Sequence, residues 1–102
     1  MPQTDEEVQN LGNHFDIRLV ADNEERGKVF LLRKKAAADA AEASAALTPF
    51  REDPNFSVRE VLHDTEAGTK VMELTSLCRD ICRAMTALSR QQDDDKRRGP
   101  LF

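Results

Sequence analysis

A regular apolar series in the C-terminal third of the chain constrains its fold more than any other feature. Apolar residues recur there at intervals of three and four positions, at Val71, Leu74, Cys78, Ile81, Met85 and Leu88. This spacing corresponds to the a and d positions of a heptad repeat, so an α-helix would carry the whole series on one face. Asp64 can cap the start of such a helix. We therefore predict one long helix over residues 65–91, about 40 Å in length at 1.5 Å per residue.

An alanine-rich stretch predicts a second helix. Residues 36–46 contain eight alanines, and alanine has the highest helix propensity of all residues. We expect this helix over residues 23–47. Thr48 would stop it, because a residue that precedes proline is disfavoured in the α region. Its small side chains would let a neighbouring helix approach closely. The expected close-packing face consists of Leu32, Ala36, Ala40, Ala43 and Leu47.

The segment before the alanines supports two interpretations. A capping sequence at Thr4, followed by apolar residues three and four positions apart, predicts a helix over residues 5–19. Residues 15–19 also alternate between apolar and polar, which would let them pair with residues 28–32 in a β-hairpin. A further capping sequence at Asp22 favours the helical interpretation, because it is typical of a helix start.

The fold class that we expect is all-α: a small antiparallel helical bundle or hairpin with one long C-terminal heptad-patterned helix. The alternative is an α+β fold with an N-terminal β-hairpin at about residues 15–32. A length of 102 residues suits one domain. We assign residues 1–91 to a single helical domain and residues 92–102 to a charged flexible tail. Its final residues, Leu101 and Phe102, are a possible docking anchor.

Two shorter segments join the expected helices. Residues 48–56 include two prolines and are expected to form a loop, which Phe50 and Phe56 would anchor on the core. Residues 57–63 begin with another capping sequence and are expected to form about two helical turns.

The composition argues against several classes of protein. The net charge of −4 opposes general attraction to nucleic acid or to anionic lipid. The sequence has no apolar run of about 20 residues, which a membrane span would need. It also does not begin with a basic segment followed by an apolar one, as an export signal does. We therefore expect a cytoplasmic or nuclear protein that is not secreted and not inserted into a membrane.

We expect no catalytic site, no bound metal and no cofactor. His63 and Cys78 would lie about 22 Å apart along a continuous helix, too far to share a zinc ion. A phosphate-accepting role for His63 is opposed by Asp64 and Glu66, which would repel an incoming phosphoryl group. Cys78 and Cys82 lie four residues apart in the expected helix, where a disulfide would require distortion, so we expect reduced thiols.

These arguments predict a non-enzymatic assembly subunit or adaptor that contacts a protein partner through helix–helix packing, as a homo-oligomer or in a hetero-complex. A helix of about 40 Å is longer than the rest of so small a body can cover, which leaves apolar surface for a partner. The expected interaction seam is Val71, Leu74, Cys78, Ile81, Met85 and Leu88. One alternative is a small chaperone-like carrier of a partner's apolar segment. A DNA-associated regulator is less favoured, because the basic clusters at residues 33–35 and 96–98 lie close to acidic residues.

Overall fold

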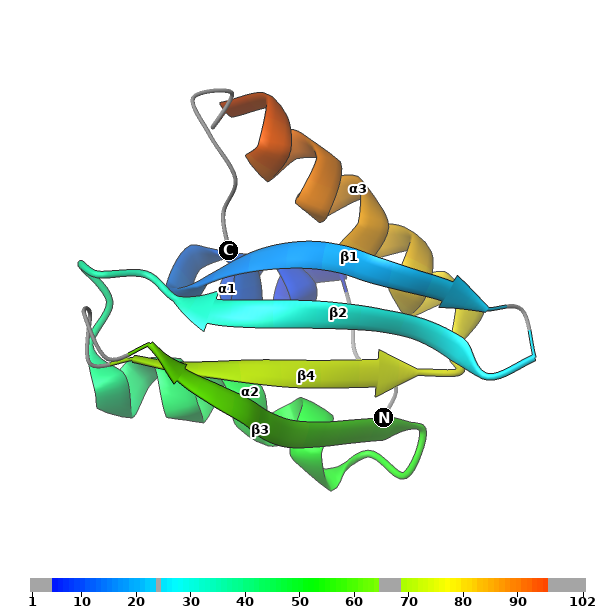
Figure 1. The fold of residues 1–102 in the computed structure, drawn as a ribbon, viewed down its shortest axis with the longest axis horizontal. Coiled ribbons are helices and arrows are strands. Elements are labelled where there is room, and N and C mark those ends of the chain that lie inside the picture. Colours follow the sequence, from blue (N-terminus) through cyan, green and yellow to red (C-terminus); the bar gives the residue numbers. More distant parts are fainter. Residues whose placement is uncertain (1–4, 24, 65–68, 96–102) are drawn as a thin grey trace.

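A computed structural model, which describes residues 5–23, 25–64 and 69–95, shows an α+β fold with one four-stranded antiparallel sheet and three helices (Figure 1). The elements in chain order are α1 (Asp5–His14), β1 (Phe15–Asn23), β2 (Gly27–Lys34), α2 (Ala40–Glu52), β3 (Phe56–Asp64), β4 (Thr69–Ser76) and α3 (Arg79–Asp95). The strand order is β1-β2-β4-β3, so two hairpins lie side by side with β2 and β4 at the centre. The prediction of an all-α bundle is therefore wrong.

The heptad-patterned helix over residues 65–91 does not form. The first part of the apolar series lies on β4, and α3 begins only at Arg79. Successive residues of a strand face opposite sides of the sheet, so Leu74 faces the helices while Val71 faces away from them. The β-branched residues Val71 and Thr75 favour a strand in this segment. The spacing of three between Val71 and Leu74 therefore does not reflect a helical face.

The N-terminal β-hairpin, which the sequence left as the alternative, is present. Helix α1 stops at His14, and β1 pairs with β2 from Phe15 opposite Lys34 to Asn23 opposite Gly27. The side chain of Asn23 accepts hydrogen bonds from the backbone N–H groups of Glu25 and Arg26. The polar residues that resembled a helix cap therefore stabilise a turn, which is the other common role of such side chains.

Helix α2 begins at Ala40 and ends at Glu52, so it both begins and ends later in the chain than the predicted helix over residues 23–47. Its N-cap is Asp39, whose carboxylate accepts from the backbone N–H groups of Ala41 and Glu42. The helix then continues through Pro49 to Glu52, because Phe50 is fully buried and its ring meets that of Phe56 edge-on, with centroids 5.3 Å apart. The predicted loop over residues 48–56 and the short helix over residues 57–63 are accordingly replaced by the end of α2 and by β3.

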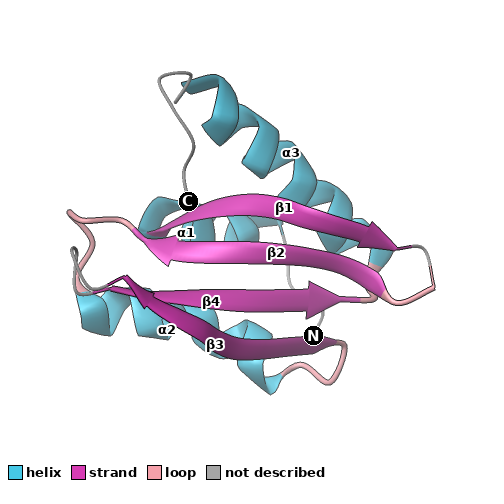
Figure 2. Ribbon diagram, viewed as in Figure 1, coloured by secondary structure: helices cyan, strands magenta, loops and turns pink. Residues whose placement is uncertain are grey.

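The molecule has two layers, with the helices on one face of the sheet (Figure 2). The sheet contributes alternate side chains to the core between the layers, and the helices contribute one face each. The fully buried large side chains of this core are Leu11, Ile17, Phe30, Leu32, Leu47, Phe50, Leu74 and Met85. Helix α3 extends to Asp95, so the boundary that we predicted at residue 92 falls inside a helix.

Candidate interaction surfaces

The most distinctive surface of the molecule is the face of the sheet opposite the helices, which we call the uncovered face. In the view of Figure 1, α1 and α2 lie behind the sheet, α3 passes behind β1 and extends beyond its edge, and no described helix lies in front of the sheet. Strand pairing places residues of this face in rows across the sheet, since side chains directly opposite one another point to the same side. One row is Arg18, Leu31, Glu73 and Arg59, and a second is Asp16, Arg33, Val71 and Leu62.

Apolar residues cross the uncovered face obliquely, in a band that we call the apolar diagonal. It consists of Ala21, Val29, Leu31, Val71 and Leu62. Val71 is buried although it does not belong to the core beneath the helices, whereas Leu62 at the outer end is 52% exposed. Val29 and Leu31 are half-buried. Apolar residues on all four strands therefore form an oblique series from β1 to β3 on a face that no described helix covers.

Charged side chains border the apolar diagonal. On one side Asp16 lies directly opposite Arg33, and Arg18 lies next to Leu31. On the other side the Arg59 Nε atom lies 2.8 Å from Oε1 of Glu73 in a cross-strand ion pair. This alternation of apolar and charged groups can orient a partner, because charge contributes to specificity while apolar contact contributes to affinity.

The two edges of the sheet differ in how they are covered. Along the outer edge of β1, the backbone N–H of Ile17 donates to Oε1 of Gln92 at 2.6 Å, and that of Leu19 donates to Oγ of Ser89 at 3.3 Å. Gln92 Nε2 donates in turn to the carbonyl of Phe15 at 3.1 Å. Helix α3 therefore satisfies backbone groups of Phe15, Ile17 and Leu19 on this edge, which would otherwise be open to another strand.

The opposite edge, formed by β3, has no comparable cap among the described residues. Leu62 and Val61 on this strand are exposed. Glu60 pairs with Met72 and Leu62 with the adjacent Val71, so Val61 is the extra residue of a β-bulge in the pairing with β4. Glu60 lies 3.4 Å from Nε2 of His63 and 3.2 Å from Nζ of Lys70.

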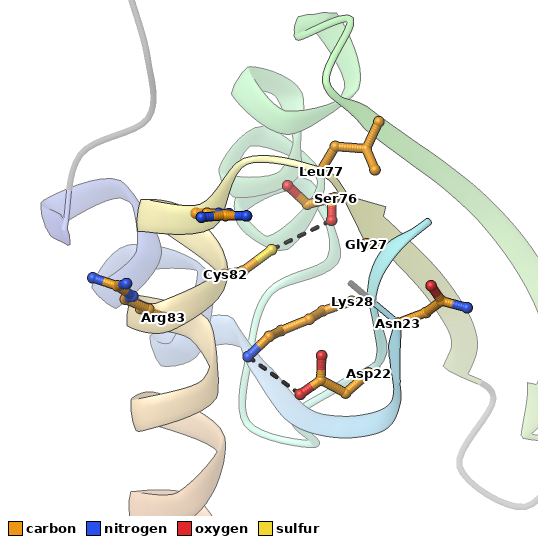
Figure 3. A pocket seen from close by; sticks show the side chains of 9 residues that line it. Asp22, Asn23, Gly27, Lys28, Ser76, Leu77, Cys82 and Arg83 are labelled. Atoms are coloured by element: carbon orange, nitrogen blue, oxygen red, sulfur yellow. Dashed lines mark hydrogen bonds and ion pairs between the residues drawn. The ribbon is translucent and has the colours of Figure 1, made fainter. Parts of the chain in front are cut away.

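A pocket of about 340 Å³ lies between the β1–β2 turn, the end of β4 and the start of α3 (Figure 3). Lys28 pairs with Asp22 across 3.5 Å, and the buried thiol of Cys82 donates to the Ser76 carbonyl at 3.4 Å. Arg79 and Arg83 also line the pocket. The carboxylate, amine and thiol are already engaged with one another or with the backbone, so we assign this pocket no reaction.

The predicted seam residues lie on different elements. Val71 and Leu74 belong to β4, Cys78 lies just before α3, and Ile81, Met85 and Leu88 lie on α3. Leu74, Ile81, Met85 and Leu88 are buried in the core beneath the sheet, with Cys78 packed against it. They therefore serve the protein's own packing in this structure.

The predicted close-packing face is also divided. Leu32 lies on β2, Ala36 is an exposed residue of the following loop, and Ala40 is the exposed first residue of α2. Only Ala43 and Leu47 lie together on the buried face of α2. The possible tail anchor at Leu101 and Phe102 lies outside the described residues.

Sequence patterns did not identify Ala21, Val29, Leu31 and Leu62 as surface candidates. A signal for two of them was available, because residues 29–32 are four consecutive apolar residues. Such a run in a short segment is typical of a strand with apolar residues on both faces.

Within residues 5–23, 25–64 and 69–95, no three His, Cys, Asp or Glu side chains are grouped so that they could hold a metal ion. The described helices also lack the combination of length and hydropathy that crossing a bilayer requires.

Comparison of the chain with protein-family models, with curated proteins and with solved structures finds no significant match.

Proposed function

We propose that this protein is a non-enzymatic binding subunit whose uncovered face takes up an amphipathic segment of a partner protein. The observation that carries the proposal is the apolar diagonal. An apolar sheet face is normally covered by a second layer of structure, whereas no described helix covers the face that carries the apolar diagonal, and Leu62 at the end of the diagonal is 52% exposed.

The arrangement of apolar and charged residues on the uncovered face favours one kind of partner segment. A single apolar band bordered by charge matches the apolar stripe of an amphipathic helix, which presents anchors at intervals of three and four residues. Arg18 on one side and the Arg59–Glu73 pair on the other would meet the polar flanks of that helix. This differs from the predicted helix–helix seam, whose residues are largely occupied in the core.

A displayed library of random peptides tests the proposal. Peptides selected on the wild-type protein are expected to be amphipathic, and Leu31→Lys is expected to weaken their binding at least about tenfold because it places a charge on the apolar diagonal. The matched control is Leu77→Lys, the same substitution at a residue that is 60% exposed but lies outside the uncovered face. This control is expected to bind like the wild type.

Two results would contradict the proposal. One is a selection that yields no binding peptide, and the other is a set of peptides that bind Leu31→Lys as tightly as the wild type. Titration with duplex DNA at low salt belongs in the same experiment, since salt-dependent binding of the duplex would instead favour the DNA-associated alternative.

A further inference from the structure

The residues along the open edge of β3 could pair with the same residues of a second, antiparallel copy. Two copies of a strand related by a two-fold axis perpendicular to the sheet pair antiparallel. Each pair of facing residues then occurs twice, once on each side of the axis. When Val61 of one copy lies opposite Leu62 of the other, Glu60 lies opposite His63. We propose that two copies of this chain pair through β3 in this register, forming one continuous eight-stranded sheet.

The β-bulge restricts which registers are possible. Residues directly opposite one another must point to the same side of the sheet. Glu60 and His63 pair with Met72 and Lys70 of β4, whose positions place them on the helix-covered side. They can therefore meet across the axis, whereas a register that pairs Glu60 with Leu62 would join opposite sides, because Leu62 pairs with Val71 on the uncovered side.

The exposure of the side chains agrees with pairing at this edge. Val61 is 39% exposed and Leu62 is 52% exposed, and pairing would cover both in each copy. The corresponding edge of β1 cannot pair in the same way, because Gln92 and Ser89 occupy the backbone N–H groups of Ile17 and Leu19. Growth of the sheet therefore stops at two copies, which accords with a closed dimer.

The two-fold axis also determines how the two uncovered faces of the dimer are oriented. A two-fold axis perpendicular to the sheet keeps both sets of helices on one side and both uncovered faces on the other. An interface formed mainly by one strand from each copy is at the small end of specific interfaces. The dimer is therefore in equilibrium with the monomer, and its population depends on protein concentration.

Light scattering of the full chain over a concentration series tests the inference. The wild type is expected to shift from monomer to dimer as concentration rises. Val61→Lys is expected to raise the dimer dissociation constant at least about tenfold, since it places a charge opposite the partner's Leu62. The matched control is Val20→Lys, the same change at a 46% exposed residue of the opposite edge strand, and its dimer is expected to persist.

A second variant tests the register. In the double variant Val61→Lys with Leu62→Glu, each lysine lies opposite a glutamate of the other copy, so dimer formation is expected to recover relative to Val61→Lys alone. Recovery also shows that the single variant lost pairing and not its fold.

The inference is overturned if the wild type stays monomeric throughout, if Val61→Lys dimerises like the wild type, or if the double variant recovers no dimer. It is also overturned if Leu31→Lys abolishes the dimer while Val61→Lys keeps it, since the copies would then meet through their uncovered faces. In this register Val61 shares the uncovered side with Leu62, so Leu31 separates the two proposals: Leu31→Lys is expected to weaken peptide binding and to keep the dimer.

Discussion

Gln92 on α3 accepts a hydrogen bond from the backbone N–H of Ile17, a residue 75 positions earlier in the chain, at 2.6 Å. Its amide nitrogen donates to the carbonyls of Phe15 and Gly12 at 3.1 and 3.4 Å. One buried side chain therefore connects the last helix to the junction of α1 and β1. It also satisfies part of an edge that would otherwise be free to pair with another strand.

Replacing this amide should lower stability. In Gln92→Ala the three backbone groups lose their partners, which we expect to reduce the free energy of unfolding by about 1–3 kcal/mol, because buried polar groups are costly to leave unpaired. Urea denaturation followed by circular dichroism measures the loss. The neighbouring Gln91 is exposed, and Gln91→Ala should change stability by less than about 0.5 kcal/mol. Equal stability of the two variants would show that the Gln92 contacts contribute nothing.

Gly27 should not tolerate a side chain. Its φ angle is +97°, and an added Cβ atom would collide with the backbone carbonyl of Ser76. Both effects are absent from the unfolded chain, so Gly27→Ala should lower the unfolding free energy by about 1–3 kcal/mol. Thermal unfolding tests this expectation. Arg26→Ala in the same turn serves as the control, and a Gly27→Ala melting temperature equal to that of this control would be evidence against the turn geometry.

Ile81 is 5% exposed and belongs to the core, so an acidic residue there should unfold the chain. We expect Ile81→Asp to cost at least about 4 kcal/mol, since the carboxylate would be buried without a partner. Arg83→Asp changes an exposed residue of the same helix and should leave the circular dichroism spectrum unchanged. A folded Ile81→Asp protein would contradict the burial of this residue in the core.

Removing the N-cap of α2 should lower the stability of the protein by a smaller amount. Asp39 accepts from two backbone N–H groups of the first helical turn, at 3.0 and 3.1 Å. Asp39→Ala should therefore destabilise the protein by about 1 kcal/mol, whereas Asp39→Asn should retain most of the stability. Chemical denaturation of both variants distinguishes capping from a general effect of charge, because charge alone would make them equally unstable.

Local signals in the sequence identified only part of the fold. Alternation over residues 15–19 indicated the hairpin, but Asp22 and Asn23 favoured a helix start, because the same side chains cap helices and stabilise turns. The alanines of α2 correctly indicated a helix, while its end beyond Pro49 depends on the burial of Phe50, which only the tertiary structure determines.

The prediction for the C-terminal region was wrong for a different reason. Intervals of three and four fitted a helix from Val71 to Leu88, yet β4 and α3 divide this series between them. A short run such as residues 71–75, which alternates imperfectly, fits either period, and pairing with β2 and β3 decides between them. The candidate surface could not be predicted either, because Leu31, Val71 and Leu62 are brought together only by strand order.

A nuclear magnetic resonance titration of the isotopically labelled protein with a selected amphipathic peptide locates the binding surface residue by residue. We predict that the backbone shifts that change most belong to residues of the apolar diagonal, above all Val29, Leu31 and Val71, while the exposed side of α2 at Ser44 and Ala45 stays unchanged. Shift changes concentrated on the helices, with the diagonal unaffected, would show that the peptide does not bind the uncovered face.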